Sequence, residues 1–119
     1  MGRDNILRHK TYSFALRVIS VYKHIVAEHK EFVLSKQLLR AGTAPGALVR
    51  ESEFAQSKPD FISKLSIALK EANETEYWIS LLKDSDFISQ EVAAPLLKDI
   101  DEIVRMLVAS IKTTKNNIN

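Results

Sequence analysis

The sequence contains no cysteine, and only three glycines and three prolines occur among its 119 residues. Without cysteine the chain forms neither disulfides nor thiolate metal sites, as is usual in a reducing compartment. The scarcity of glycine and proline favours helices over a turn-rich β fold. No apolar run approaches the ~20 residues that a membrane span needs. Arg17 and Lys23 interrupt the apolar residues near the N-terminus, which is not typical of a secretory signal. We therefore expect a cytoplasmic protein with no membrane partner.

The charge of the chain is small but unevenly distributed. Its length predicts one domain, and its 45% apolar and 27% charged residues are ordinary for a soluble globular protein. The net charge is +2, yet residues 1–50 carry nine Lys or Arg against three Asp or Glu, and residues 51–119 carry eight against twelve. This asymmetry indicates either a basic face for nucleic acid or, more commonly, a positive helix pair packed against a negative one.

Apolar residues recur with helical periodicity through most of the chain. No strand pattern, repeat or low-complexity segment competes with this pattern. Long amphipathic segments joined by short connections predict an all-α fold, a single antiparallel up-down-up-down four-helix bundle. The expected helices cover residues 7–30, 35–56, 59–83 and 89–114. The expected inward side of the second helix consists of Leu38, Ala41, Gly42, Pro45, Leu48, Val49 and Ser52.

Serine residues mark three of the expected helix starts, because a serine hydroxyl can accept a hydrogen bond from an N–H group of the first turn. Ser35 is the expected N-cap of the second helix, and Ser89 that of the fourth. Ser57 precedes the third helix, with Pro59 in the first turn and Asp60 at capping-box spacing.

The apolar surface of the expected helices is larger than one bundle core needs. On a helical wheel, the apolar residues of the first and fourth helices cover arcs of roughly 160°, wider than the ~100° stripe of a surface helix. The third helix carries a second apolar patch at Ile67 and Trp78. We expect self-association or a protein partner. The candidate interface residues are Leu16, Ile67, Trp78, Val104 and Val108.

The stretch "RAGTAPGALVRESEF", residues 40–54, concentrates two glycines and a proline within five residues. A phosphate-binding loop needs G-x-x-x-x-G-K-[ST] after a strand. Gly42 and Gly46 are one residue too close for that motif, and the flanking periodicity is helical. We expect an unbroken helix that bends at Pro45, where the small neighbouring residues let another helix approach closely.

Motifs for catalysis or metal binding are scarce. No Glu-x-x-His pair and no G-x-S-x-G elbow occurs, so we expect no metal, no cofactor and no small-molecule substrate. Arg17 and His24 lie seven residues apart on one helix face and loosely resemble the Arg-x4–6-His signature of HEPN-type ribonucleases. This spacing is common by chance, and a solvated basic face is the strongly favoured explanation.

Basic residues on the first two helices are the stronger functional candidates. They could contact phosphates weakly in one chain and strongly when repeated around a ring. No series of aromatic residues for base stacking and no helix-turn-helix signature accompanies them. The candidate nucleic-acid-binding residues are Lys10, Arg17, Lys23, Lys36, Arg40 and Arg50.

Glu76 is unusual because its wheel position falls on the core side of the third helix, between Ala72 and Ile79. A buried carboxylate needs a partner. We expect Arg40 on the neighbouring helix to provide it.

The two central segments resemble a known family. The segments "LSKQLLRAGTAPGALVRES" and "DFISKLSIALKEANETEYWISLL" are similar to the central helices of bacterial four-helix bundle proteins encoded in intervening sequences of 23S ribosomal RNA genes. Three positions depart from the family pattern, with Ala44 and Leu48 at polar positions and Pro45 at an aliphatic one. The matching positions are Gln37, Leu38, Arg40, Ala41, Gly42, Thr43, Gly46, Glu51 and the run ANETEYW at 72–78.

The resemblance implies a non-catalytic bundle that assembles into a homopentameric ring. The family is similar to the accessory protein of diversity-generating retroelements, a basic pentamer that binds nucleic acid and a reverse transcriptase. We therefore expect a non-enzymatic homo-oligomer that interacts with RNA, DNA or another protein. The alternatives are a ribonuclease-like bundle that uses Arg17 and His24, and a scaffold that binds protein alone.

Overall fold

The computed structural model describes residues 3–117, and four helices account for most of them. No strand occurs in this range. Within the same range, no helix has the length and apolar content that crossing a bilayer requires. The predicted all-α four-helix bundle is confirmed. The helices are α1 (Arg3–His29), α2 (Leu34–Ser52), α3 (Lys58–Asp84) and α4 (Gln90–Asn116).

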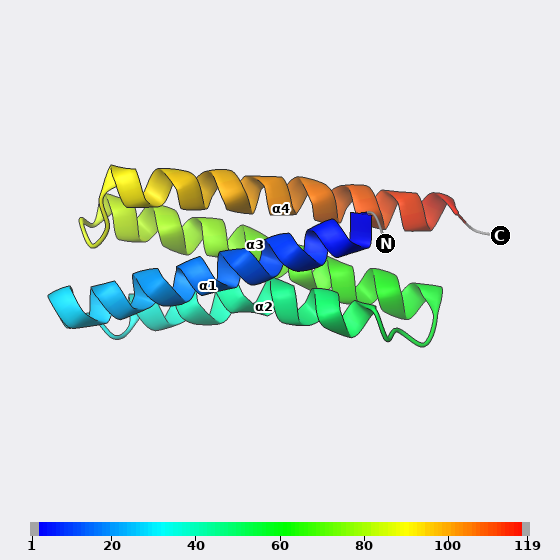
Figure 1. Cartoon of the computed structure of the whole chain (residues 1–119), viewed down its shortest axis with the longest axis horizontal. Coiled ribbons are helices and arrows are strands. Elements are labelled where there is room, and N and C mark those ends of the chain that lie inside the picture. The colour runs from blue at the N-terminus through cyan, green and yellow to red at the C-terminus, as the bar shows by residue number, and fades with distance from the viewer. Residues whose placement is uncertain (1–2, 118–119) are drawn as a thin grey trace.

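The helices run alternately up and down along a molecule of 52 × 21 × 21 Å (Figure 1). Each helix packs against its neighbours in chain order, and α1 closes the bundle against α4. The α1–α4 contact is the sparsest of the four. The α1–α2 and α3–α4 connections lie at one end, and the α2–α3 connection lies at the other. Short connections between amphipathic helices favour this antiparallel order.

The inward faces follow the helical periodicity closely. On α2, the predicted inward residues are buried apart from Leu48, which is half-buried. On α4, the centre of the predicted arc is buried, but Val92 and Val108 at its edges are exposed. The apolar arc of α4 is therefore wider than the stripe that the bundle covers.

Two of the three predicted serine caps are confirmed. Ser57 Oγ accepts a hydrogen bond of 3.1 Å from the N–H of Asp60, and Asp60 Oδ2 accepts one of 3.1 Å from the N–H of Gln56. Ser89 Oγ accepts a hydrogen bond of 3.2 Å from the N–H of Val92. These local contacts fix the starts of α3 and α4.

The prediction that Ser35 caps α2 is wrong, because Ser35 is buried within the first turn and donates to the Glu31 carbonyl at 2.7 Å. The Glu31 carboxylate takes the capping role and accepts from the N–H groups of Val33, Leu34 and Ser35 at 2.8–2.9 Å. Partial burial raises the pKa of the Glu31 carboxyl, but these backbone hydrogen bonds outweigh it and hold that pKa below its ordinary value. A side chain that precedes the helix thus satisfies its free N–H groups.

Helix α2 ends at Ser52, four residues before the predicted end. Tight turns follow, in which the N–H of Phe54 donates to the Glu51 carbonyl at 3.0 Å. Ser57 then adopts an extended backbone (φ −158°, ψ 166°) as the N-cap of α3. The chain reverses direction between α2 and α3, and this reversal takes several non-helical residues, so α2 ends earlier than the apolar pattern alone indicates.

Residues 42–46 are helical, as predicted, so this stretch is neither a loop nor a linker. The close approach is confirmed as well. A Cβ atom on Gly42 would lie 2.8 Å from Val18 Cγ2, and one on Gly46 would lie 3.4 Å from the Thr11 carbonyl oxygen. The approaching helix is α1, and the bend at Pro45 stays a prediction.

Candidate interaction surfaces

Two of the six candidate basic residues join α1 to α4. Lys10 Nζ lies 3.0 Å from Glu102 Oε1, and Arg17 forms an ion pair with Asp99. These contacts bridge the sparsest helix–helix contact of the bundle. Both cations are therefore partly neutralised by carboxylates of the same chain.

Arg40 lies on a different flank, where it joins α2 to α3. Its NH1 atom donates to Glu71 Oε1 at 3.1 Å, its NH2 group pairs with Glu74, and its Nε atom donates to Gln37 Oε1 at 3.1 Å. Trp78 Nε1 also donates to Glu74 Oε2, at 3.0 Å. Glu74 is thus the shared acceptor of a surface network that fixes both Arg40 and Trp78.

The electrostatics of this network follow from its hydrogen bonds. The bond from Trp78, joined by the pairing with Arg40, holds the pKa of the Glu74 carboxyl below its ordinary value. Desolvation lowers the pKa of Arg40, but Glu74 and Glu71 outweigh it and raise that pKa above its ordinary value. The folded chain therefore favours the carboxylate form of Glu74 and the guanidinium form of Arg40.

The predicted pairing of Glu76 with Arg40 is wrong. Glu76 is exposed, and Thr75 occupies the buried position beside it. Glu71 and Glu74 lie on the flank of α3 that faces α2, whereas Glu76 is rotated away from that flank. The helical wheel predicted a buried position for Glu76, because the buried side of α3 covers a narrower arc than the periodicity indicated.

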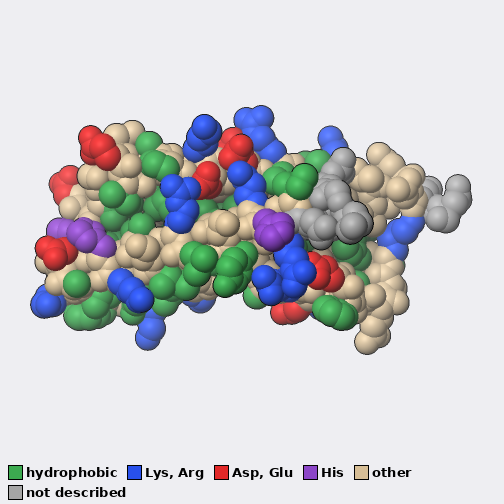
Figure 2. Space-filling view, viewed as in Figure 1, with side chains coloured by type: hydrophobic (Ala, Val, Ile, Leu, Met, Phe, Trp, Pro, Cys, Tyr) green, Lys and Arg blue, Asp and Glu red, His purple; other side chains and the backbone are tan. Residues whose placement is uncertain are grey.

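The remaining basic candidates are placed separately. The Arg50 guanidinium lies 5.2 Å from the centre of the Tyr12 ring, a cation–π contact between α2 and α1. Lys23 and Lys36 are exposed and form no ion pair with the described residues. On the face drawn in Figure 2, Lys and Arg side chains are scattered among acidic and hydrophobic ones. The fold does not gather the six candidates into one patch.

The charge asymmetry of the sequence is explained largely within the bundle. The described ion pairs that join different helices or connections all run from a cation in residues 1–50 to a carboxylate in residues 51–117. Arg8 with Glu53, at 3.6 Å, is another example. A positive helix pair packed against a negative one therefore accounts for the pattern without a nucleic acid.

The five candidate interface residues are distributed over three helices, α1, α3 and α4. Leu16 on α1, Ile67 on α3 and Val108 on α4 are 52%, 41% and 38% exposed. Val104 is half-buried against the core, and Trp78 is half-buried in the Glu74 network.

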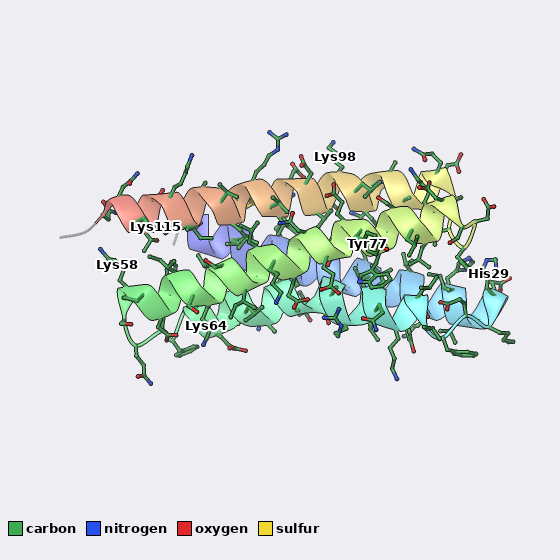
Figure 3. All side chains as sticks on the ribbon, turned by 180° about the vertical axis from the view of Figure 1, so that it is seen from behind. His29, Lys58, Lys64, Tyr77, Lys98 and Lys115 are labelled. Carbon is green, nitrogen blue, oxygen red and sulfur yellow. The ribbon has the colours of Figure 1, made fainter. Side chains whose placement is uncertain are left out.

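Sequence reasoning missed the most exposed aromatic residues. Phe54, Tyr77, Phe32 and Tyr12 are 84%, 58%, 55% and 53% exposed. Tyr77 lies near the middle of the face opposite α1 (Figure 3). The second helix was predicted to continue through Phe54, so the sequence did not indicate that this side chain would be exposed. Ser57 and Pro59 indicate a turn just beyond Phe54, and this signal could have predicted the exposure of Phe54.

Arg17 and His24 do not converge in a common cavity. Arg17 lines two shallow cavities of about 480 and 240 Å³ beside α4. His24 lines a third one of about 330 Å³ with His29 and Phe87. Among the described residues, no three His, Asp or Glu side chains are grouped as metal ligands would be. The geometry gives the ribonuclease hypothesis no assembled site.

A family comparison agrees with this architecture. The model of the 23S rRNA-intervening sequence protein family matches residues 3–109, nearly the whole chain. The chain belongs to this family. A crystal structure from Bacteroides thetaiotaomicron, a protein of unknown function from the S23 ribosomal protein family, is similar at 51% identity and a TM-score of 0.91. The similarity covers 92% of this chain and 98% of that one. A search of curated proteins found no match.

Within this family member, the three positions predicted to depart from the family pattern have different environments. Pro45 is buried, whereas Ala44 and Leu48 are half-buried. Apolar side chains therefore occupy positions in contact with the packed interior, where a polar side chain would need a hydrogen-bond partner.

Proposed function

We propose that this member of the 23S rRNA-intervening sequence family is a non-enzymatic interaction module that works as a homo-oligomer, specifically a homopentameric ring. The supporting observation is the number of large apolar side chains left exposed on a small bundle. These are Ile6, Tyr12, Leu16, Phe32, Val33, Phe54, Ile67, Tyr77, Val92 and Val108. Burying one such side chain fully is worth about 1.5–3 kcal/mol, so covering several of them stabilises an assembly substantially.

The distribution of these residues favours a ring over a simple dimer. Tyr12 and Leu16 lie on α1, whereas Tyr77 lies on the opposite face of the bundle (Figures 1 and 3). A two-fold dimer uses the same patch on both copies and leaves the other face uncovered. A head-to-tail contact uses two different faces of each copy and closes into a ring when the rotation permits.

A nucleic-acid partner is the second part of the proposal. Three candidate cations on α1 and α2, namely Lys23, Lys36 and Arg50, are free of ion pairs with the described residues. One chain would contact few phosphates with them and bind weakly. A ring repeats them around its axis, so RNA or DNA would bind by multivalency.

Size-exclusion chromatography with light scattering, with and without ribosomal RNA fragments, tests the proposal. We expect the mass of a homopentamer. Leu16→Glu and Val108→Glu should each reduce it, because each puts a charge on an exposed apolar position. Ser20→Glu, an exposed polar position of α1, is the matched control. A wild-type mass of one chain at every concentration would contradict the assembly.

The same samples test the nucleic-acid partner. We expect RNA to bind without cleavage and to dissociate as salt rises. Lys23→Glu combined with Lys36→Glu should weaken binding while the oligomer mass stays constant. Absence of binding at low salt would identify a scaffold for protein alone. Cleavage that His24→Ala abolishes would overturn the non-enzymatic assignment.

A further inference from the structure

A cavity opens at the end of the bundle that carries the α2–α3 connection. Helix α1 begins short of this end, where α3 and α4 continue (Figure 1). The cavity measures about 610 Å³. Its apolar lining comes from three helices, with Leu7 on α1, Val49 on α2, and Phe61 and Leu65 on α3. This volume accommodates an aromatic side chain.

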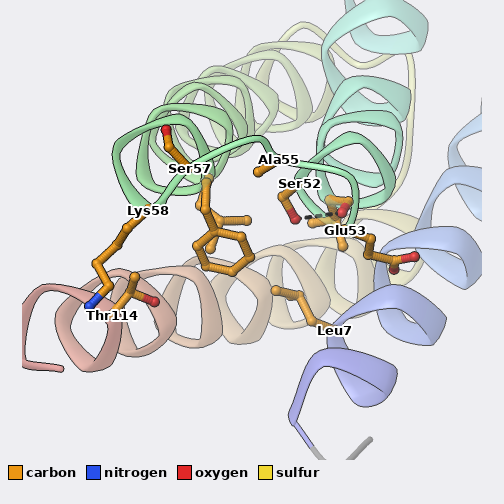
Figure 4. Close-up of a pocket in the computed structure, with 10 residues that line it drawn as sticks. Leu7, Ser52, Glu53, Ala55, Ser57, Lys58 and Thr114 are labelled. Atoms are coloured by element: carbon orange, nitrogen blue, oxygen red, sulfur yellow. Dashed lines mark hydrogen bonds between the residues drawn. The ribbon is translucent and has the colours of Figure 1, made fainter. Parts of the chain in front are cut away.

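The rim of the cavity carries a cation without an ion pair. Lys58 is half-buried and pairs with no carboxylate of the described residues. It belongs to the first turn of α3, and the N-terminal end of a helix disfavours a positive charge. Glu53 lies across the cavity from it (Figure 4), at 3.6 Å from Arg8 Nε. An anionic group brought to Lys58 would therefore be favourable.

Phe54 lies beside the same cavity, between the lining residues Glu53 and Ala55. At 84% it is the most exposed large hydrophobic side chain of the described residues. The turn that carries it is fixed, because the N–H of Phe54 donates to the Glu51 carbonyl and that of Ala55 to the Ser52 carbonyl at 3.0 and 3.1 Å. The exposed ring is displayed on a hydrogen-bonded turn.

We propose that two copies of this chain meet at these ends, each inserting Phe54 into the cavity of the other. The chemistry is complementary: the cavity offers an apolar lining and the Lys58 ammonium, and the inserted turn offers the Phe54 ring and the Glu53 carboxylate. Phe54 and the cavity lie at the same end of each chain. A two-fold axis therefore places the Phe54 ring of each copy in the cavity of the other at once. This inference rests on the proposed homo-oligomer and adds a contact that joins two rings end to end.

The absence of cysteine makes the contact testable by disulfide formation between single-cysteine variants. Glu53→Cys and Lys58→Cys protein are mixed under oxidising conditions, and the covalent heterodimer is quantified on a non-reducing gel. We expect efficient crosslinking. Adding Phe54→Ser to both variants should lower the yield about tenfold or more, since burying a phenylalanine is worth at least that factor in association.

Two controls give each outcome a meaning. Glu28→Ser in the same pair of variants changes an exposed residue near the C-terminal end of α1, at the other end of the bundle, and should leave the yield unchanged. Glu53→Cys mixed with Lys36→Cys should not crosslink. Two results would overturn the end contact alone, provided that the wild-type protein is an oligomer. One is that the Glu53→Cys and Lys58→Cys variants fail to crosslink, and the other is that Phe54→Ser leaves their crosslinking yield unchanged. A wild-type monomer at every concentration overturns the proposed function and this inference together.

Discussion

Gly42 on α2 faces Val18 on α1 with no room for a methyl group between them. A Cβ atom on Gly42 would lie 2.8 Å from Val18 Cγ2 and 2.9 Å from Val18 Cγ1. Val18 is fully buried, and a β-branched side chain has little rotamer freedom with which to move aside. The glycine therefore sets how closely α1 and α2 approach.

Gly42→Ala should destabilise the fold, although alanine is the better helix former. Overpacking costs about 1–3 kcal/mol, against a helix-propensity gain of about 1 kcal/mol, so we expect a net loss of roughly 1 kcal/mol. Gly46→Ala is the matched control, because its Cβ would make only an ordinary contact of 3.4 Å. Chemical denaturation measures both variants. Val18→Ala should rescue Gly42→Ala, and additive losses would contradict the steric explanation.

Glu31→Gln should weaken the start of α2. The variant loses the charge on an acceptor of three backbone N–H groups, and caps of this kind are worth about 1 kcal/mol. The folded-state pKa of Glu31 is depressed, so its stabilisation is complete above the ordinary value of 4.5 and is lost as the pH falls through the folded-state pKa. Thermal denaturation should therefore show a difference at pH 7 that shrinks in acid. Glu28→Gln, an exposed control one turn earlier, should show none.

Glu74→Ala should release both Arg40 and Trp78. Arg40 is 48% exposed, so solvent screening limits its pairing, and we expect a total loss of about 0.5–1 kcal/mol. Trp78 is the only tryptophan, so its fluorescence spectrum reports loss of its hydrogen bond directly. Glu76→Ala on the same helix should change neither stability nor fluorescence. Equal effects of the two variants would be inconsistent with the network.

Arg17→Asp should destabilise the α1–α4 contact, because it places two carboxylates where Arg17 now pairs with Asp99. An exposed pair of this kind contributes about 0.2–1 kcal/mol. Asp99→Arg in the same chain should restore most of the loss by reversing the pair. Urea denaturation at low and high salt measures the cycle, and the coupling should decrease as salt rises. A coupling near zero at low salt would show that the pair is only incidental.

The sequence by itself determined what depends on near neighbours along the chain. The apolar periodicity defines the four helices and the buried side of α2, including Gly42 and Pro45. The serine caps at Ser57 and Ser89 follow from contacts across three residues. Such features could be predicted because a helix fixes the relative direction of residues three and four positions apart.

The tertiary structure decided what depends on how the helices are rotated and aligned against one another. Periodicity shows that Glu71 and Glu74 share a flank of α3, but only packing brings that flank, and not Glu76, against Arg40. The same packing divides the basic residues among several surfaces and leaves Phe54 exposed beside a cavity. These relationships join residues far apart in the chain, and no local pattern encodes the axial alignment that brings them together.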